Sequence, residues 1–164
     1  DSFVNWRGMS ESGGRRIKRA LLIRVSSIHF VNEQDLNRFS KIERISPYIS
    51  KRKKEIEEEN KSIKADKSLL LNGRNMTNIG LFRRYALAYL QNHPEINDEL
   101  TVMVRQLAPT PHGVPMEIYV FVKDKVWVNS ERIMSDIFDH LLAAIPFFDL
   151  ECFEYISSPS YASE

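Results

Sequence analysis

The residues that could do chemistry in this 164-residue chain are few and scattered. One cysteine, Cys152, is joined by four histidines: His29, His93, His112 and His140. A zinc site needs several Cys and His ligands at short spacings, and this set does not supply one. Cys152 falls on the expected core-facing side of its segment, which is more typical of a buried structural thiol than of a nucleophile.

Two pairs of side chains have a spacing that could serve a reaction. Asp136 and His140 are four residues apart on an expected helix and share one face, but a metal would need a third ligand that the sequence does not show. Asp149 and Glu151 share one face of an expected strand, where surface charges are more typical than an acid–base pair without an enclosing pocket. Phosphate-binding glycine loops and the G-x-S-x-G motif are absent. We therefore expect no enzyme activity, no metal and no cofactor.

The composition is that of an ordinary globular domain. Lys and Arg number 23, Asp and Glu number 22, and 43% of the residues are hydrophobic. A net charge of +1 argues against a polycationic nucleic-acid binder, and EIYVFVKD at 117–124 lacks the aromatic signature of RNA-recognition sheets. We expect no nucleic-acid partner. A single cysteine excludes an intrachain disulfide and fits a reducing compartment.

The elements that must position these residues follow from hydrophobic periodicity and from capping and breaking residues. We expect a strand at about 16–26, a helix capped by Asn32, a helix capped by Asn78 and ended by Pro94, two strands joined as a hairpin, a helix ended by Pro146, and a final strand at 148–155. The hairpin strands are expected at 100–107 and 116–127. This order predicts an α+β fold of the ferredoxin-like, split β-α-β type, with helices on one face of the sheet.

A highly charged segment interrupts this pattern. Ile49, Ile56 and Ile63 are spaced by seven and leave one thin apolar stripe on a solvated helix. Leu69–Leu71 is expected as a short strand or a buried loop anchor. The predicted organisation has four parts: the end of a preceding β domain and a linker (1–14), an α/β domain (15–156), a helical insertion within it (about 48–72), and a flexible tail (157–164). We expect the chain to be a domain of a longer parent.

Strand alternation also predicts an incompletely covered sheet face. One face carries the apolar residues Ile17, Leu21, Ile23, Val102, Val104, Ile118, Val120 and Leu150 and is expected under the helices. The opposite face is half apolar: Ala20, Leu22, Arg24, Met103, Arg105, Tyr119, Phe121 and Phe153. A large exposed apolar patch usually marks a contact surface. Another part of the chain, a further subunit or a ligand could cover it.

Several long segments closely resemble one protein family. They are NWRGMSESGGRRIKR at 5–19, MTNIGLFRRYALAYLQNHP at 76–94, MVRQLAPTPHGVPMEIYVFVKDKVW at 103–127, SDIFDHLLAAIPFF at 135–148 and SPS at 158–160. In order, they resemble the C-terminal part of the miniconductance mechanosensitive channels, a branch of the small-conductance mechanosensitive channel family of bacteria. The charged segment at 48–67 resembles this family least.

The resemblance implies a function that the residue pattern alone does not. Such channels open under tension in the bacterial inner membrane and release small solutes during hypoosmotic stress. They are homoheptamers whose C-terminal domains form a cytoplasmic cage that filters solutes. This chain would then contact other copies of itself on the cytoplasmic side of the membrane, and reach the membrane through N-terminal parts absent from it. Phe3–Trp6 would be the last trace of the preceding β domain.

On this interpretation, the incompletely covered sheet face becomes a subunit contact. Its candidate residues are Arg24, Met103, Arg105, Tyr119 and Phe121. Two other classes stay open. One is a regulatory ferredoxin-like module that binds a small molecule in a pocket between copies. The other is an enzyme, for which the sequence shows no site.

Overall fold

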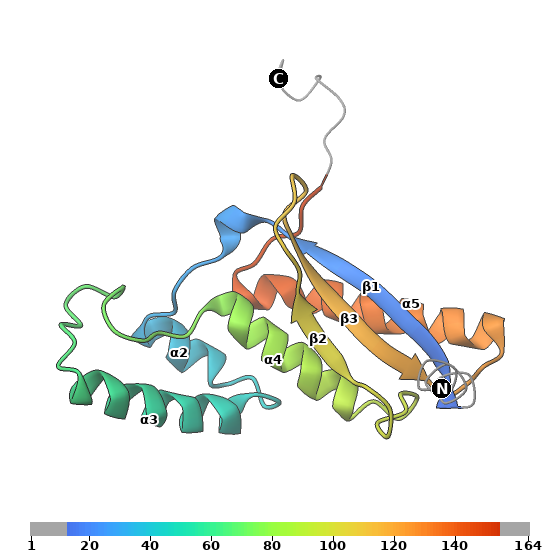
Figure 1. The fold of residues 1–164 in the computed structure, drawn as a ribbon, viewed down its shortest axis with the longest axis horizontal. Coiled ribbons are helices and arrows are strands. Elements are labelled where there is room, and N and C mark those ends of the chain that lie inside the picture. Colours follow the sequence, from blue (N-terminus) through green and yellow to red (C-terminus); the bar gives the residue numbers. More distant parts are fainter. Residues whose placement is uncertain (1–12, 155–164) are drawn as a thin grey trace, which may run out of the picture.

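The computed structural model describes residues 13–154, so the expectations for Phe3–Trp6 and for 157–164 lie outside the described residues. This part of the chain is a mixed α/β domain with a three-stranded antiparallel sheet (Figure 1). The strands are β1 (Arg15–Ile23), β2 (Met103–Gln106) and β3 (Val114–Val122). Their order is β1-β3-β2, so the central strand β3 is antiparallel to both neighbours.

Four α-helices accompany the sheet in the described residues. They are α2 (Glu33–Phe39), α3 (Ser46–Ser62), α4 (Asn78–Gln91) and α5 (Trp127–Ala144), with short 3-10 turns at Val25–Ser27 and Ile145–Phe148. Helices α4 and α5 pack on the sheet, whereas α2 and α3 form a lobe beside it that contributes to the same hydrophobic core (Figure 1).

The core forms on the sheet face that strand alternation predicts. The strand and bridge residues expected there are each less than 10% exposed: Ile17, Leu21, Ile23, Val104, Ile118, Val120 and Leu150. Val102, expected with them, is partly buried against the same core. From the helices, Phe82, Leu90, Ile137 and Leu141 are fully buried. Each such side chain stabilises the fold by roughly 1.5–3 kcal/mol relative to an exposed position.

The starts of α2 and α4 follow from local capping chemistry. The Asn32 Oδ1 accepts a hydrogen bond from the Asp35 backbone amide at 2.8 Å, and the Asp35 carboxylate accepts one from the Asn32 amide, so the predicted cap of α2 is confirmed. The predicted cap of α4 is wrong by one residue. Thr77 is the cap, and its hydroxyl accepts from the Gly80 amide at 3.1 Å.

The predicted final strand at 148–155 is wrong. Ile145–Phe148 forms a 3-10 turn, and Asp149 adopts a left-handed conformation with φ of 58°. The described chain then meets the free edge of β1 through a single antiparallel bridge between Cys152 and Ile23. Because the residues around Pro146 form a tight turn rather than extended backbone, only 151–153 reach the edge of the sheet.

The charged insertion is partly as predicted. Ile49 and Ile56 are buried on α3, but Ile63 lies beyond the helix and is 60% exposed. The prediction for Leu69–Leu71 is wrong, because these leucines lie in a turn and are largely exposed. Polar contacts among residues 66–72, rather than core packing, hold the loop that follows α3.

Candidate functional site

The candidate surface is the sheet face opposite α4 and α5, which we call the outer sheet face. Strand register sets its pattern: Tyr119 on β3 lies between Met103 on β2 and Lys18 on β1. In the next row, Glu117 lies between Arg105 and Ala20. The structure therefore brings together two predicted contact residues, Met103 and Tyr119, and places Arg105 beside them.

An ion pair organises the middle of the outer sheet face. The Nε of Arg105 donates to a Glu117 carboxylate oxygen at 2.8 Å. The Glu117 side chain is only 7% exposed, whereas that of Arg105 is 47% exposed. A carboxylate so deeply buried requires a charged partner, so Arg105 is positioned by Glu117. Sequence reasoning missed Glu117, because the pairing depends on the register of the hairpin.

Aromatic side chains continue this face toward the start of β1. The rings of Tyr119 and Phe121 pack edge to face, with centroids 5.7 Å apart. The Arg16 guanidinium lies 5.9 Å from the centre of the Tyr119 ring, within cation–π range. Phe121 is only 2% exposed, which corrects its predicted place on an open surface. Tyr119 is partly exposed and remains accessible.

Arg24 does not belong to this cluster. It follows the end of β1, six residues beyond Lys18, the partner of Tyr119, which is about 20 Å along an extended chain. Its guanidinium lies 3.5 Å from the Glu151 carboxylate, and both side chains are exposed. The exposed charges that share the outer sheet face are those of Arg16, Lys18 and Arg105.

The two carboxylates considered as an acid–base pair have different partners. Asp149 accepts two hydrogen bonds from Arg38, at 2.6 and 3.2 Å, and these bonds raise the pKa of the arginine. Glu151 instead pairs with Arg24. Each carboxylate thus serves a structural ion pair. Burial raises the pKa of the Cys152 thiol, which disfavours the reactive thiolate.

His140 belongs to an aromatic cluster instead of a metal site. Its Nε2 is hydrogen-bonded to the Tyr85 hydroxyl at 2.7 Å, and its ring stacks on Tyr89 with centroids 4.0 Å apart. Within residues 13–154, no group of three or more His, Cys, Asp or Glu side chains is arranged to hold a metal. Burial, followed by the charge of Arg44, lowers the pKa of His140.

Two further findings bear on identity. No helix in the described part of the chain combines the length and apolar character that crossing a membrane requires. No protein-family model matches the chain.

Proposed function

We propose that this chain is the C-terminal cage domain of a bacterial mechanosensitive channel of the miniconductance type. In this role it would assemble as a homoheptamer on the cytoplasmic side of the inner membrane and filter solutes released during hypoosmotic stress. It would perform no catalysis and need no cofactor. The segments that resemble this family, at 5–19, 76–94, 103–127 and 135–148, are the first support for the proposal.

The strand arrangement also supports a ferredoxin-like fold. That fold has a fourth strand on the free edge of the first, antiparallel to it. In this chain, the Cys152–Ile23 bridge occupies that edge in that orientation. The Arg24 amide donates to the Glu151 carbonyl at 2.8 Å, and the Phe153 amide donates to the Leu22 carbonyl at 2.9 Å. These bonds are what a very short fourth strand would make.

The outer sheet face supports the proposal that the domain contacts other copies of itself. Met103 and Tyr119 are partly exposed at its centre, and Arg16, Lys18 and Arg105 surround them. A sheet face with free access to water is expected to be mostly polar. The accessible thioether of Met103 and ring of Tyr119 therefore favour the interpretation that another surface covers this face. A ring is closed by a contact between two different surfaces of each subunit, and this face would supply one of them.

The α2–α3 lobe would brace the cage wall. It stands beside the sheet rather than on it (Figure 1), so its exposed face could reach a neighbouring subunit or the interior of the cage while Phe39, Ile45 and Ile49 pack in the core. Deletion of the insertion should then alter channel threshold or conductance. Unchanged values would show that the lobe is dispensable for gating.

Cross-linking in the full-length parent protein tests the assembly. In native membranes, glutaraldehyde, which joins lysine side chains, should give a ladder of species up to seven subunits. Met103→Glu, which places a charge on the proposed contact surface, should shorten that ladder. Val128→Glu, at a 70% exposed position on α5, is the matched control and should leave the ladder unchanged. A full ladder from Met103→Glu would contradict the proposed contact surface.

Electrophysiology tests the activity separately. The parent protein, expressed in cells that lack their own mechanosensitive channels, should give tension-activated currents in membrane patches and improve survival of hypoosmotic shock. If currents are absent although the protein reaches the membrane, the channel assignment is wrong.

A further inference from the structure

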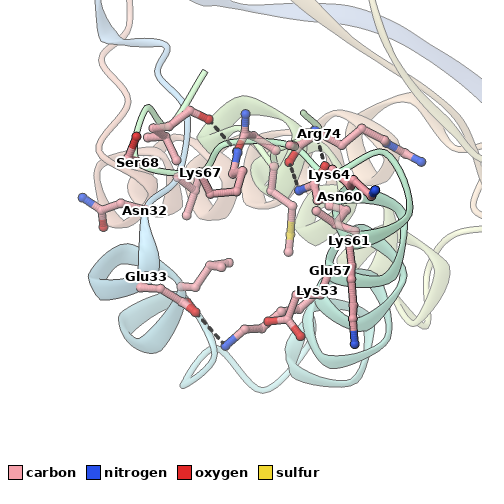
Figure 2. Close-up of a pocket in the computed structure, with 17 residues that line it drawn as sticks. Asn32, Glu33, Lys53, Glu57, Asn60, Lys61, Lys64, Lys67, Ser68 and Arg74 are labelled. Carbon is pink, nitrogen blue, oxygen red and sulfur yellow. Dashed lines mark hydrogen bonds and ion pairs between the residues drawn. The ribbon is translucent and has the colours of Figure 1, made fainter. Parts of the chain in front are cut away.

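A groove lies within the α2–α3 lobe, and nothing in the proposed function uses it. Its walls are α2, α3 and the loop at 64–76, and its volume is about 850 Å³ (Figure 2). This size lies within the range of about 300–1,000 Å³ that is usual for small-molecule sites. We call it the insertion groove. Its apolar lining consists of Val31, Leu36, Ile56, Ala65, Leu70 and Met76.

Polar contacts hold the groove open in a defined shape. The Asn60 side chain clamps the loop: its Nδ2 donates to the Arg74 carbonyl at 3.0 Å, and its Oδ1 accepts from the Arg74 amide at 2.8 Å. The Lys67 ammonium donates to the carbonyls of Leu70 and Asn72 and to the Asn75 side chain. A loop fixed in this way costs little ordering entropy when a ligand binds.

The charges around the groove are unbalanced. Its lining includes five basic residues (Lys53, Lys61, Lys64, Lys67 and Arg74) and two acidic ones (Glu33 and Glu57). All three N–H donors of the Lys67 ammonium are used in hydrogen bonds to the loop, and Arg74 forms an ion pair with Glu59. Lys53 pairs with Glu33 at 3.2 Å across the opening (Figure 2).

Two cations, Lys61 and Lys64, and one carboxylate, Glu57, remain in the lining once these pairs are set aside. Within residues 13–154, Lys61 and Lys64 take part in no ion pair. Both are at the C-terminal end of α3, one on its last turn and one just beyond it, and their side chains point in different directions (Figure 2). Both border the apolar lining of the groove. Because both side chains are exposed, they can turn toward an anionic group at this end of the groove, and the rest of its molecule would then cover that lining.

We propose that the insertion groove binds an amphipathic organic anion, namely a carboxylate with an aliphatic chain. Lys61 and Lys64 hold the carboxylate, and the chain covers Ile56, Leu36 and Met76. An inorganic anion would leave the apolar lining uncovered, while a neutral aliphatic molecule would leave both ammonium groups without a partner. Leu70 lines the groove, and its neighbours in the chain, Leu69 and Leu71, are exposed. This inference stands independently of the channel assignment.

Titration of the isotope-labelled chain with decanoate, followed by amide NMR shifts, tests the proposal. Decanoate should give saturable shifts confined to residues 31–36 and 53–76. Decanol, which keeps the aliphatic chain but not the charge, should bind roughly 10-fold more weakly, because charge-assisted hydrogen bonds are lost. Inorganic phosphate should give no saturable shifts in the groove. Absence of saturation by millimolar decanoate, or equal binding of decanol, would overturn the proposal.

Paired substitutions on one helix separate the groove from general charge. Lys61→Gln/Lys64→Gln should weaken decanoate binding roughly 10-fold. Lys51→Gln/Lys54→Gln removes the same charge from exposed positions of α3 outside the groove and should leave binding unchanged. All four positions are exposed, so the fold should tolerate each change. Equal weakening in both double variants would show that decanoate senses net charge alone, which contradicts a site in the groove.

Discussion

A single buried amide, that of Asn78, joins three segments that are far apart in the sequence. Its Nδ2 donates to the Ser27 carbonyl at 2.9 Å and to the Phe148 carbonyl at 3.0 Å. Its Oδ1 accepts from the His29 backbone amide at 2.9 Å. Asn78 is fully buried, so it satisfies backbone groups that water cannot reach. At the residue scale, it acts as a clamp at the start of α4 and not as the predicted cap.

Asn78→Ala should lower the free energy of unfolding by about 3 kcal/mol, because it leaves several buried polar groups unsatisfied. Urea denaturation measures the loss. The matched control is Asn92→Ala at the other end of α4, where an exposed amide donates to the Ala88 carbonyl. We expect a change of less than about 0.5 kcal/mol there. Comparable losses in both variants would contradict the clamp.

At the element scale, the sheet has one central strand, β3, that is paired along both sides, and two edge strands that are held by fewer contacts. β3 pairs with β1 over nine residues and with β2 over four. The free edge of β1 meets the described chain only at the Cys152 bridge. An edge covered by so short a segment opens more easily than a central strand, because few contacts must break at once.

Amide hydrogen exchange should therefore be slower in the central strand than at this edge of the sheet. The Val120 amide, in the buried centre of β3, should exchange only through global unfolding. The Phe153 amide, which bonds to Leu22 at the edge, should exchange at least about 100-fold faster, through local opening. Amide exchange followed by NMR measures both rates. Equal protection would indicate that the last segment forms a strand as stable as the rest of the sheet.

At the scale of the whole molecule, an aromatic cluster connects the lobe to the body of the domain. Tyr89 on α4 stacks on His140 of α5 and packs edge to face on His93. Arg44, from the segment between α2 and α3, lies 5.2 Å from the centre of the Tyr89 ring. The two histidines thus lie beside a permanent cation that holds the lobe in place.

This cluster predicts lower stability in mild acid. Burial, together with Arg44, lowers the pKa of His93 and His140 in the folded state, although Asp136 and Glu95 act in the opposite sense on His93. The unfolded histidines keep a pKa near 6.5, so the unfolded state binds more protons as pH falls below about 6.5. The stabilisation is complete above that pH and decreases through the lower, folded pKa.

Thermal unfolding between pH 7.5 and 5 measures this dependence. His93→Gln/His140→Gln should flatten the pH profile, since the titrating groups are gone. His112→Gln, at an exposed loop position, should retain the profile of the parent. A double variant as acid-sensitive as the parent would show that these two histidines do not cause the effect.

Much of this architecture could be predicted from the sequence, because it depends on interactions between residues that are close together in the chain. Alternation along 16–26 and 116–122 predicts the core face, because neighbouring side chains of a strand must point to opposite sides. Asn32, followed by acidic residues in the first turn, predicts the start of α2, because the cap and the helix dipole act within one turn. Among the candidate contact residues, Met103 and Tyr119 were predicted on one face for the same reason, and the structure places them as cross-strand partners.

Tertiary structure decided what depends on distant partners. The pairing of Arg105 with Glu117 needs the hairpin register, and the burial of Phe121 and the separation of Arg24 need the positions of other segments. The short final bridge and the exposed leucines of the loop at 69–71 likewise depart from local pattern. By itself, the sequence determined the local elements and the face that each one buries, because those preferences act within a few residues. Only the folded chain decided which polar groups meet and which surfaces stay open, because loop closure and competition for the core act over its whole length.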